Sequence, residues 1–118
     1  MDIEILKENI QLKENTFYYE LKERSTFDVG MYNQMIYTII VSFDSIKEDA
    51  VRCKLSLNMW ELFFLICKDL INHQNEFDCC EIIGINEEVI SKIVNDMYEI
   101  GNFISWKKEI NPRDYFVG

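Results

Sequence analysis

Alternating apolar and polar residues dominate the first half of the chain. In the segments 16–22 and 50–57 every second residue is apolar. A period of about two residues is typical of a β-strand with one face in solvent. The segment 35–43 is apolar on both faces and rich in β-branched residues, as expected of a central strand. The pattern therefore predicts a strand in each of these segments.

The N-terminal segment 3–12 fits two patterns. Its apolar residues suit a strand, but the spacing of Ile3, Leu6 and Ile10 also suits one face of a helix. A strand is favoured because the strand expected at 16–22 needs a hairpin partner. Polar connectors are expected between these elements, at 13–15, 24–30 and 44–49.

The second half of the chain changes to a helical pattern. A first helix is expected at 58–72, because Asn58 followed three positions later by Glu61 resembles a capping box. This helix has few polar residues, so we expect the sheet to cover one side and another element to cover much of the other side.

A second helix is expected at 87–100, where the apolar residues recur at helical spacing. Asn86 can cap its N-terminus, and Gly101 can end it in the left-handed conformation. A short helical turn closed by Gly84 is expected before it, at 78–83, and a last short strand after it, at 103–107.

These elements predict one α+β domain spanning 1–118, in which an N-terminal antiparallel sheet of three or four strands packs with two main helices and a short final strand. Apolar residues make up 48% of the chain, which is enough to form a core without disulfides or metal. Trp60 and Trp106 are expected in the core or at an interface, and loss of either is expected to destabilise the fold.

The formal net charge of -9 disfavours nucleic acid and anionic membranes as partners. Residues 58–118 carry 5 basic and 11 acidic side chains, against 7 and 10 in residues 1–57, so the negative charge is concentrated in the second half. The N-terminus lacks the pattern of a secretory signal, and no apolar run reaches the ~18 residues of a membrane span. We therefore expect a cytoplasmic protein with reduced cysteines.

Catalytic chemistry has little support in the sequence. His73 is the only histidine, and its polar context suits a helix end better than a catalytic base. No nucleophile elbow, Walker loop or dinucleotide fingerprint occurs. Cys67, His73, Cys79 and Cys80 have ligand types that suit zinc, but their spacing is poor, so neither a metal nor a cofactor is expected.

The order of elements from 58 to 107 resembles that of winged helix-turn-helix domains, although no specific motif supports the resemblance. In such domains the second helix would enter the major groove of DNA. From Glu61 to Glu99, however, the sequence contains nine acidic residues and only two basic ones. A fold of this kind would therefore be expected to contact protein.

The function that these observations favour is that of a small acidic inhibitor, such as an immunity protein or a phage-type blocker, which occupies a basic site on a toxin, nuclease or other nucleic-acid enzyme. Its expected contact surface consists of Glu76, Asp78, Glu81, Glu87, Glu88, Asp96 and Glu99. The alternatives are a winged-helix transcription regulator or adaptor, an enzyme with an unrecognised pocket, and a structural subunit, including a homodimer paired through a sheet edge.

Overall fold

The computed structural model of the chain describes residues 3–73, 82–106 and 108–118. Within them it contains five α-helices and one short 3₁₀ helix. They are α1 (Glu4–Ile10), α2 (Phe17–Arg24), α3 (Val29–Asp44), α4 (Asp49–His73), α5 (Glu87–Ser105) and the 3₁₀ helix η1 (Pro112–Tyr115). The β-type pairing in this part of the chain is one isolated bridge between Thr26 and Ile83.

The predicted α+β fold is wrong, because the described residues are helical and form no sheet. The expected strands overlap α1 (segment 3–12), α2 (16–22), α3 (35–43), α4 (50–57) and the end of α5 (103–107). Periodicity misled in α3 because the positions of segment 35–43 that face solvent, Tyr37 and Val41, are themselves apolar. A run that is apolar on every face suits such a helix as well as it suits a central strand.

Two expectations that depended on strands fail for the same reason. The wing strand expected at 103–107 is replaced in its first part by the last residues of α5, so the winged-helix resemblance is not supported. A homodimer joined through a sheet edge is also excluded for the described residues, since they offer no sheet.

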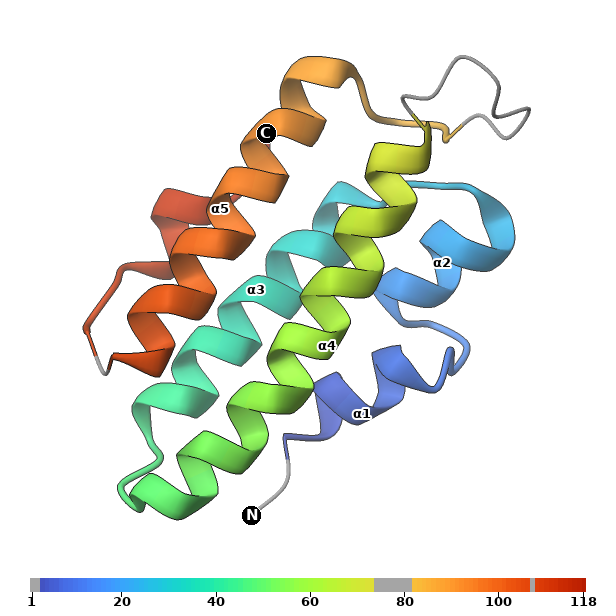
Figure 1. The fold of residues 1–118 in the computed structure, drawn as a ribbon. Helices are drawn as coiled ribbons and strands as arrows, with labels where there is room; N and C mark the ends of the chain where they lie inside the picture. Colours follow the sequence, from blue (N-terminus) through green and yellow to red (C-terminus); the bar gives the residue numbers. More distant parts are fainter. Residues whose placement is uncertain (1–2, 74–81, 107) are drawn as a thin grey trace.

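The three long helices α3, α4 and α5 lie side by side, and α1 and α2 lie on the other side of α4 from α5 (Figure 1). The core between them is largely aliphatic, with an aromatic cluster where α2 meets α3. There the rings of Phe17 and Phe27 meet edge to face at a centroid distance of 5.1 Å, and both rings approach Tyr32 at 5.3 Å. This contact attaches the short helix α2 to the long helices.

Helix α4 is one helix of 25 residues that begins more than two turns before the expected start at 58. Leu55, Met59, Leu62, Ile66 and Leu70 are buried along it at intervals of three or four residues. The alternation seen at 50–57 therefore has no structural meaning, because that segment faces the core once per helical turn.

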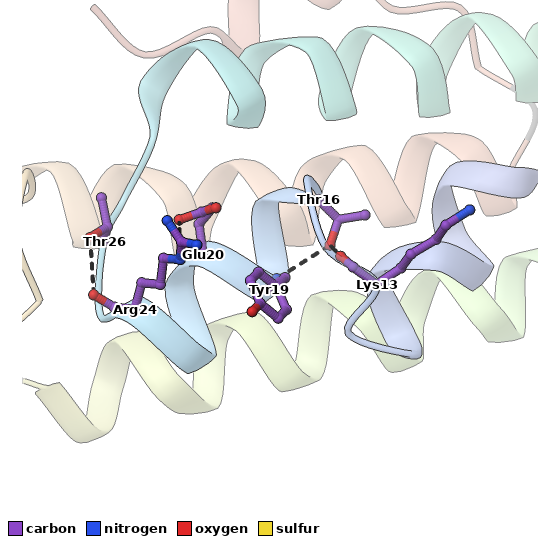
Figure 2. A network of polar contacts seen from close by, with 6 residues as sticks. All are labelled: Lys13, Thr16, Tyr19, Glu20, Arg24 and Thr26. Atoms are coloured by element: carbon purple, nitrogen blue, oxygen red, sulfur yellow. Dashed lines mark hydrogen bonds and ion pairs between the residues drawn. The ribbon is translucent and has the colours of Figure 1, made fainter.

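Local hydrogen bonds close both ends of α2 (Figure 2). The Thr16 hydroxyl donates to the Lys13 carbonyl at 2.7 Å and accepts from the backbone N–H of Tyr19 at 3.3 Å. At the other end the Thr26 hydroxyl donates to the Arg24 carbonyl at 3.0 Å. A threonine N-cap of this kind starts a helix even where the following residues alternate in polarity.

The start of the second predicted helix is confirmed, but its end is not. The Asn86 side chain caps α5 by accepting from the backbone N–H of Val89 at 2.9 Å. Helix α5 then continues past Gly101 to Ser105, so the predicted left-handed stop at Gly101 is wrong. Gly84 does have a positive φ of 95°, and a Cβ atom there would lie 2.8 Å from the Phe27 carbonyl oxygen. The predicted turn at 78–83 lies mostly outside the described residues.

Two asparagines hold the short elements in place. Asn9 is buried, donates from Nδ2 to the Ile5 carbonyl at 2.8 Å and accepts from the Tyr18 N–H at 2.8 Å, which joins α1 to the start of α2. Asn33 of α3 exchanges two hydrogen bonds of 2.8 Å with the backbone of Val117, which ties the C-terminal tail to α3. Neither role was predicted, because each partner is set by tertiary structure.

The two tryptophans differ in their surroundings. Trp60 packs between α4 and α5 against Gly101, and its Nε1 donates to the Ser105 hydroxyl at 3.3 Å. Trp106 is 72% exposed, so the prediction of a core position is wrong for this residue. Loss of Trp60 is still expected to destabilise the fold, whereas loss of Trp106 is not.

Candidate interaction surface

The acidic residues expected to contact a partner occupy different environments. Glu87 and Glu88 are exposed in the first turn of α5 and form no ion pair within the described part of the chain. Glu99 is partly exposed three turns further along the same helix. Carboxylates in the first turn also interact favourably with the helix dipole. The expected residues Glu76, Asp78 and Glu81 lie outside the described residues.

Asp96 does not belong to the exposed surface. It is 7% exposed and is paired with Lys92 one turn earlier on α5. Burial raises the pKa of both Tyr32 and Tyr115, and the negative charge of Asp96 adds to the shift of each. The sequence could not distinguish Asp96 from the outer carboxylates, because it falls between the apolar stripe and the polar face of α5.

The environment of Tyr32 is unusual for a phenol. Its side chain is fully buried, and its hydroxyl has no hydrogen-bond partner among the described residues. Burial raises the pKa of Tyr32 above its ordinary value, and the negative charge of Asp96 adds to the shift. Burial likewise raises the pKa of Tyr18, whose hydroxyl donates to Asp69 at 2.9 Å. Both phenols are therefore held in the neutral form.

We expect Tyr32→Phe and Tyr18→Phe to have opposite effects on stability. Tyr32→Phe removes an unpaired buried hydroxyl and should leave the free energy of unfolding unchanged or raise it by up to about 1 kcal/mol. Tyr18→Phe removes a hydrogen bond between α2 and α4 and should lower it by about 1 kcal/mol. Urea unfolding followed by circular dichroism measures both values. Equal losses in the two variants would show that the Tyr32 hydroxyl has a partner.

The residues considered for a metal are not brought together in the described part of the chain. Cys67 lies half-buried on α4, with its Sγ 3.7 Å from the sulfur of Met97, and burial raises the pKa of its thiol to about 11. His73 is the last residue of α4, and Cys79 and Cys80 lie outside the described residues. Among the described residues no group of three or more potential ligands could hold a metal ion.

Arg52 has a structural role that the sequence analysis missed. Although it is only 8% exposed, its Nε donates to the Ile104 carbonyl at 3.0 Å and its Nη1 to the Phe43 carbonyl at 2.6 Å. These carbonyls lie in the last turns of α5 and α3, where backbone donors are fewer than inside a helix, and the Phe43 carbonyl also accepts from the Ile46 N–H at 3.1 Å. The guanidinium also lies over the Phe43 ring, 5.7 Å from its centroid. Arg52 therefore caps two helices from a third, and its charge favours both helix C-termini.

The outer face of α4 carries large apolar side chains in solvent. Leu57 and Phe64 are each 67% exposed, and Ile71 is 52% exposed. The few polar residues of this helix predict that another element covers much of this side, but α5 covers only part of it, at Trp60 and Cys67. A helix that is apolar nearly all round is normally buried, so this face is a candidate interaction surface.

The hollows on the described surface are shallow. One of about 470 Å³ lies between α4 and α5 and is lined by Ile71, Ile90, Ser91, Val94, Asn95 and Tyr98. Another, of about 300 Å³, lies between α1 and α4 and includes Leu55, Asn58 and Glu61. Neither hollow gathers the nucleophile and base that covalent catalysis requires.

The fold and surface of the described residues define a small acidic helical bundle with an acidic start to α5 and an exposed apolar face on α4. Comparison of the chain with protein-family models, curated proteins and solved structures finds no match. Among the described residues, no helix is both long enough and apolar enough to cross a membrane.

Proposed function

We propose that this protein acts in the cytoplasm as an inhibitor that binds a basic protein and occupies a site where that partner would otherwise bind nucleic acid. The observation that carries the proposal is the acidic segment of the sequence that leads into α5. From Glu76 to Glu88 the sequence contains five acidic residues and no basic one. In the structure Glu87 and Glu88 are exposed at the end of this segment.

Long-range electrostatics supports this choice of partner. A chain of net charge -9 repels phosphate backbones and is attracted to the basic clefts of nucleases and related enzymes. Complementary charge raises the association rate by steering the encounter, and exposed carboxylates can occupy the positions of phosphates. An immunity protein against a toxin, or a phage-type blocker, would use the acidic surface in this way.

The test compares two matched pairs of charge reversals. Glu87→Lys with Glu88→Lys alters the α5 end, and Asp44→Lys with Glu48→Lys alters exposed carboxylates beside the turn between α3 and α4. Both pairs change the net charge equally. Immobilised wild-type protein should retain a basic protein from a lysate of its source cells. Binding of that protein, once purified, should weaken by about tenfold or more in the α5 pair, and much less in the control pair.

Inhibition must accompany the binding. The purified partner should process nucleic acid, and one equivalent of the wild-type protein should stop this activity. The proposal fails if no basic protein is retained, if the two charge-reversed pairs bind equally well, or if the bound partner remains active.

A further inference from the structure

The exposed apolar residues of α4 form a regular line. Leu57, Phe64 and Ile71 are separated by seven residues each, which is close to two turns of an α-helix, so their side chains point in nearly the same direction. In Figure 1, α4 runs between α5 on one side and α1 on the other. The line therefore follows the outer surface of the longest helix over about 21 Å, at 1.5 Å per residue.

The charges within this line are balanced. Glu61 lies three residues before Phe64 and Lys68 lies four residues after it, and both side chains are exposed. The stretch from Leu57 to Ile71 thus presents one acidic and one basic side chain on its outer face, in a chain whose net charge is -9. Two copies of the chain that met at this face would therefore bring no net like charge together there.

The line is nearly symmetric about Phe64. An aliphatic residue lies seven positions away on either side, and charged residues of opposite sign lie three positions before and four positions after it. We propose that the outer face of α4 binds a second copy of this chain, with the two α4 helices antiparallel and a two-fold axis passing beside Phe64. Phe64 then meets Phe64 of the second copy, and Leu57 meets its Ile71. Glu61 lies within one residue's rise of the second copy's Lys68, so each pair of opposite charges occurs twice.

The hollow between α4 and α5 fits the same arrangement. It lies beside Ile71, where the Leu57 side chain of the second copy arrives, and Ile90, Val94 and Tyr98 form its apolar lining. Tyr98 is itself 64% exposed, which extends the apolar face from α4 onto α5. The Leu57 side chain of the second copy would lose its contact with water in this apolar hollow.

The exposed apolar side chains supply about half of the area per partner that is typical of a stable dimer. Leu57, Phe64, Ile71 and Tyr98 are each more than half exposed. On the scale of about 150–250 Å² for a large aromatic side chain, they offer roughly 400 Å² of apolar surface. The aliphatic stems of Glu61 and Lys68 and the neighbouring polar residues of α5 can bring the contact near the ~800 Å² per partner that is typical of stable complexes.

The first test measures mass in solution against concentration, by light scattering and sedimentation. The wild-type protein should have twice the mass of one chain at about 100 μM, and its dimer fraction should rise with salt, which screens the repulsion between the two acidic chains. Phe64→Glu should give a monomer. Tyr37→Glu, which alters an exposed aromatic residue of α3, should leave the dimer intact. A wild-type monomer throughout this range would overturn the proposal.

A charge-swap cycle tests the proposed pairing. Glu61→Lys and Lys68→Glu alone should each weaken dimerisation by several-fold, because each places like charges opposite one another. The double variant should restore it, because both pairs re-form with reversed signs. An additive loss in the double variant would contradict the antiparallel register.

Disulfide trapping tests the orientation. In a background with Cys53, Cys79 and Cys80 changed to serine, Phe64→Cys should form a covalent dimer under mild oxidation, and circular dichroism should show that it remains helical. Leu57→Cys alone should not, because in an antiparallel pair the two substituted positions lie about 21 Å apart along the axis. Rapid trapping through Leu57→Cys would instead indicate a parallel pair. Charge reversal at Glu87 and Glu88 leaves this interface unchanged, so the dimer and the inhibitory function can fail separately.

Discussion

Replacing Arg52 by methionine should lower the free energy of unfolding by about 3 kcal/mol, the loss expected when two buried hydrogen bonds from a charged donor are removed. The Phe43 and Ile104 carbonyls that receive these bonds lie near the ends of α3 and α5, and methionine supplies no donor to either. Methionine fills a similar volume, so the loss reports the hydrogen bonds more than packing. Urea unfolding followed by helical circular dichroism measures it.

Two further variants separate charge from geometry at this position. Arg52→Lys keeps the positive charge but offers a single nitrogen, so it should show an intermediate loss. Lys54→Met removes an exposed charge from the same turn of α4 and should change stability by less than about 0.5 kcal/mol. If Arg52→Met and Lys54→Met have equal effects, the guanidinium does not cap α3 and α5.

The second large effect is expected at Gly101 of α5, which packs against the Trp60 ring of α4. A Cβ atom at Gly101 would lie 2.5 Å from Cζ2 and 2.9 Å from Cε2 of the Trp60 ring. Gly101→Ala should therefore lower the free energy of unfolding by about 2 kcal/mol through overpacking. This is opposite to the effect of alanine at an unhindered helix position, where it stabilises by about 1 kcal/mol relative to glycine.

The effect of Gly101→Ala on stability should have opposite signs with and without the Trp60 ring, and this reversal provides the control. With Trp60 replaced by alanine the ring is absent, so the same Gly101→Ala substitution should raise stability by about 1 kcal/mol through helix propensity. Thermal unfolding of the four proteins in this double-mutant cycle measures the coupling. If Gly101→Ala has the same effect in both backgrounds, the glycine is not required by the tryptophan ring.

Local signals in the sequence were sufficient for some elements. Asn86 followed by two glutamates predicted the start of α5, because a side-chain cap and the helix dipole act within the first turn. The connector at 44–49 was placed correctly between α3 and α4, because its residues are mostly polar. The segment 3–12 has a helical spacing at Ile3, Leu6 and Ile10. A strand was nevertheless favoured there, because the strand expected at 16–22 needs a hairpin partner.

Contacts between distant residues explain the remaining errors. Gly101 was predicted to end a helix because glycine commonly does so, but here it makes room for Trp60, which lies 41 positions earlier in the sequence. Asp96 was placed with the exposed acids and is buried beside Lys92. The outer face of α4 was expected to be covered. Only the position of α5 decides its exposure, because α5 covers Trp60 and leaves Phe64 in solvent.

The sequence by itself determined the net charge, the absence of recognisable catalytic motifs, the acidic stretch before α5 and the cap at Asn86. These depend on composition or on interactions within one helical turn. The tertiary structure decided that the apolar runs are helices, that Arg52 joins the ends of α3 and α5, and which apolar face stays exposed. The physical reason is that apolar side chains also occupy exposed positions of α3 and α4, so these helices lack the polar face, and with it the periodicity, that distinguishes a helix from a strand.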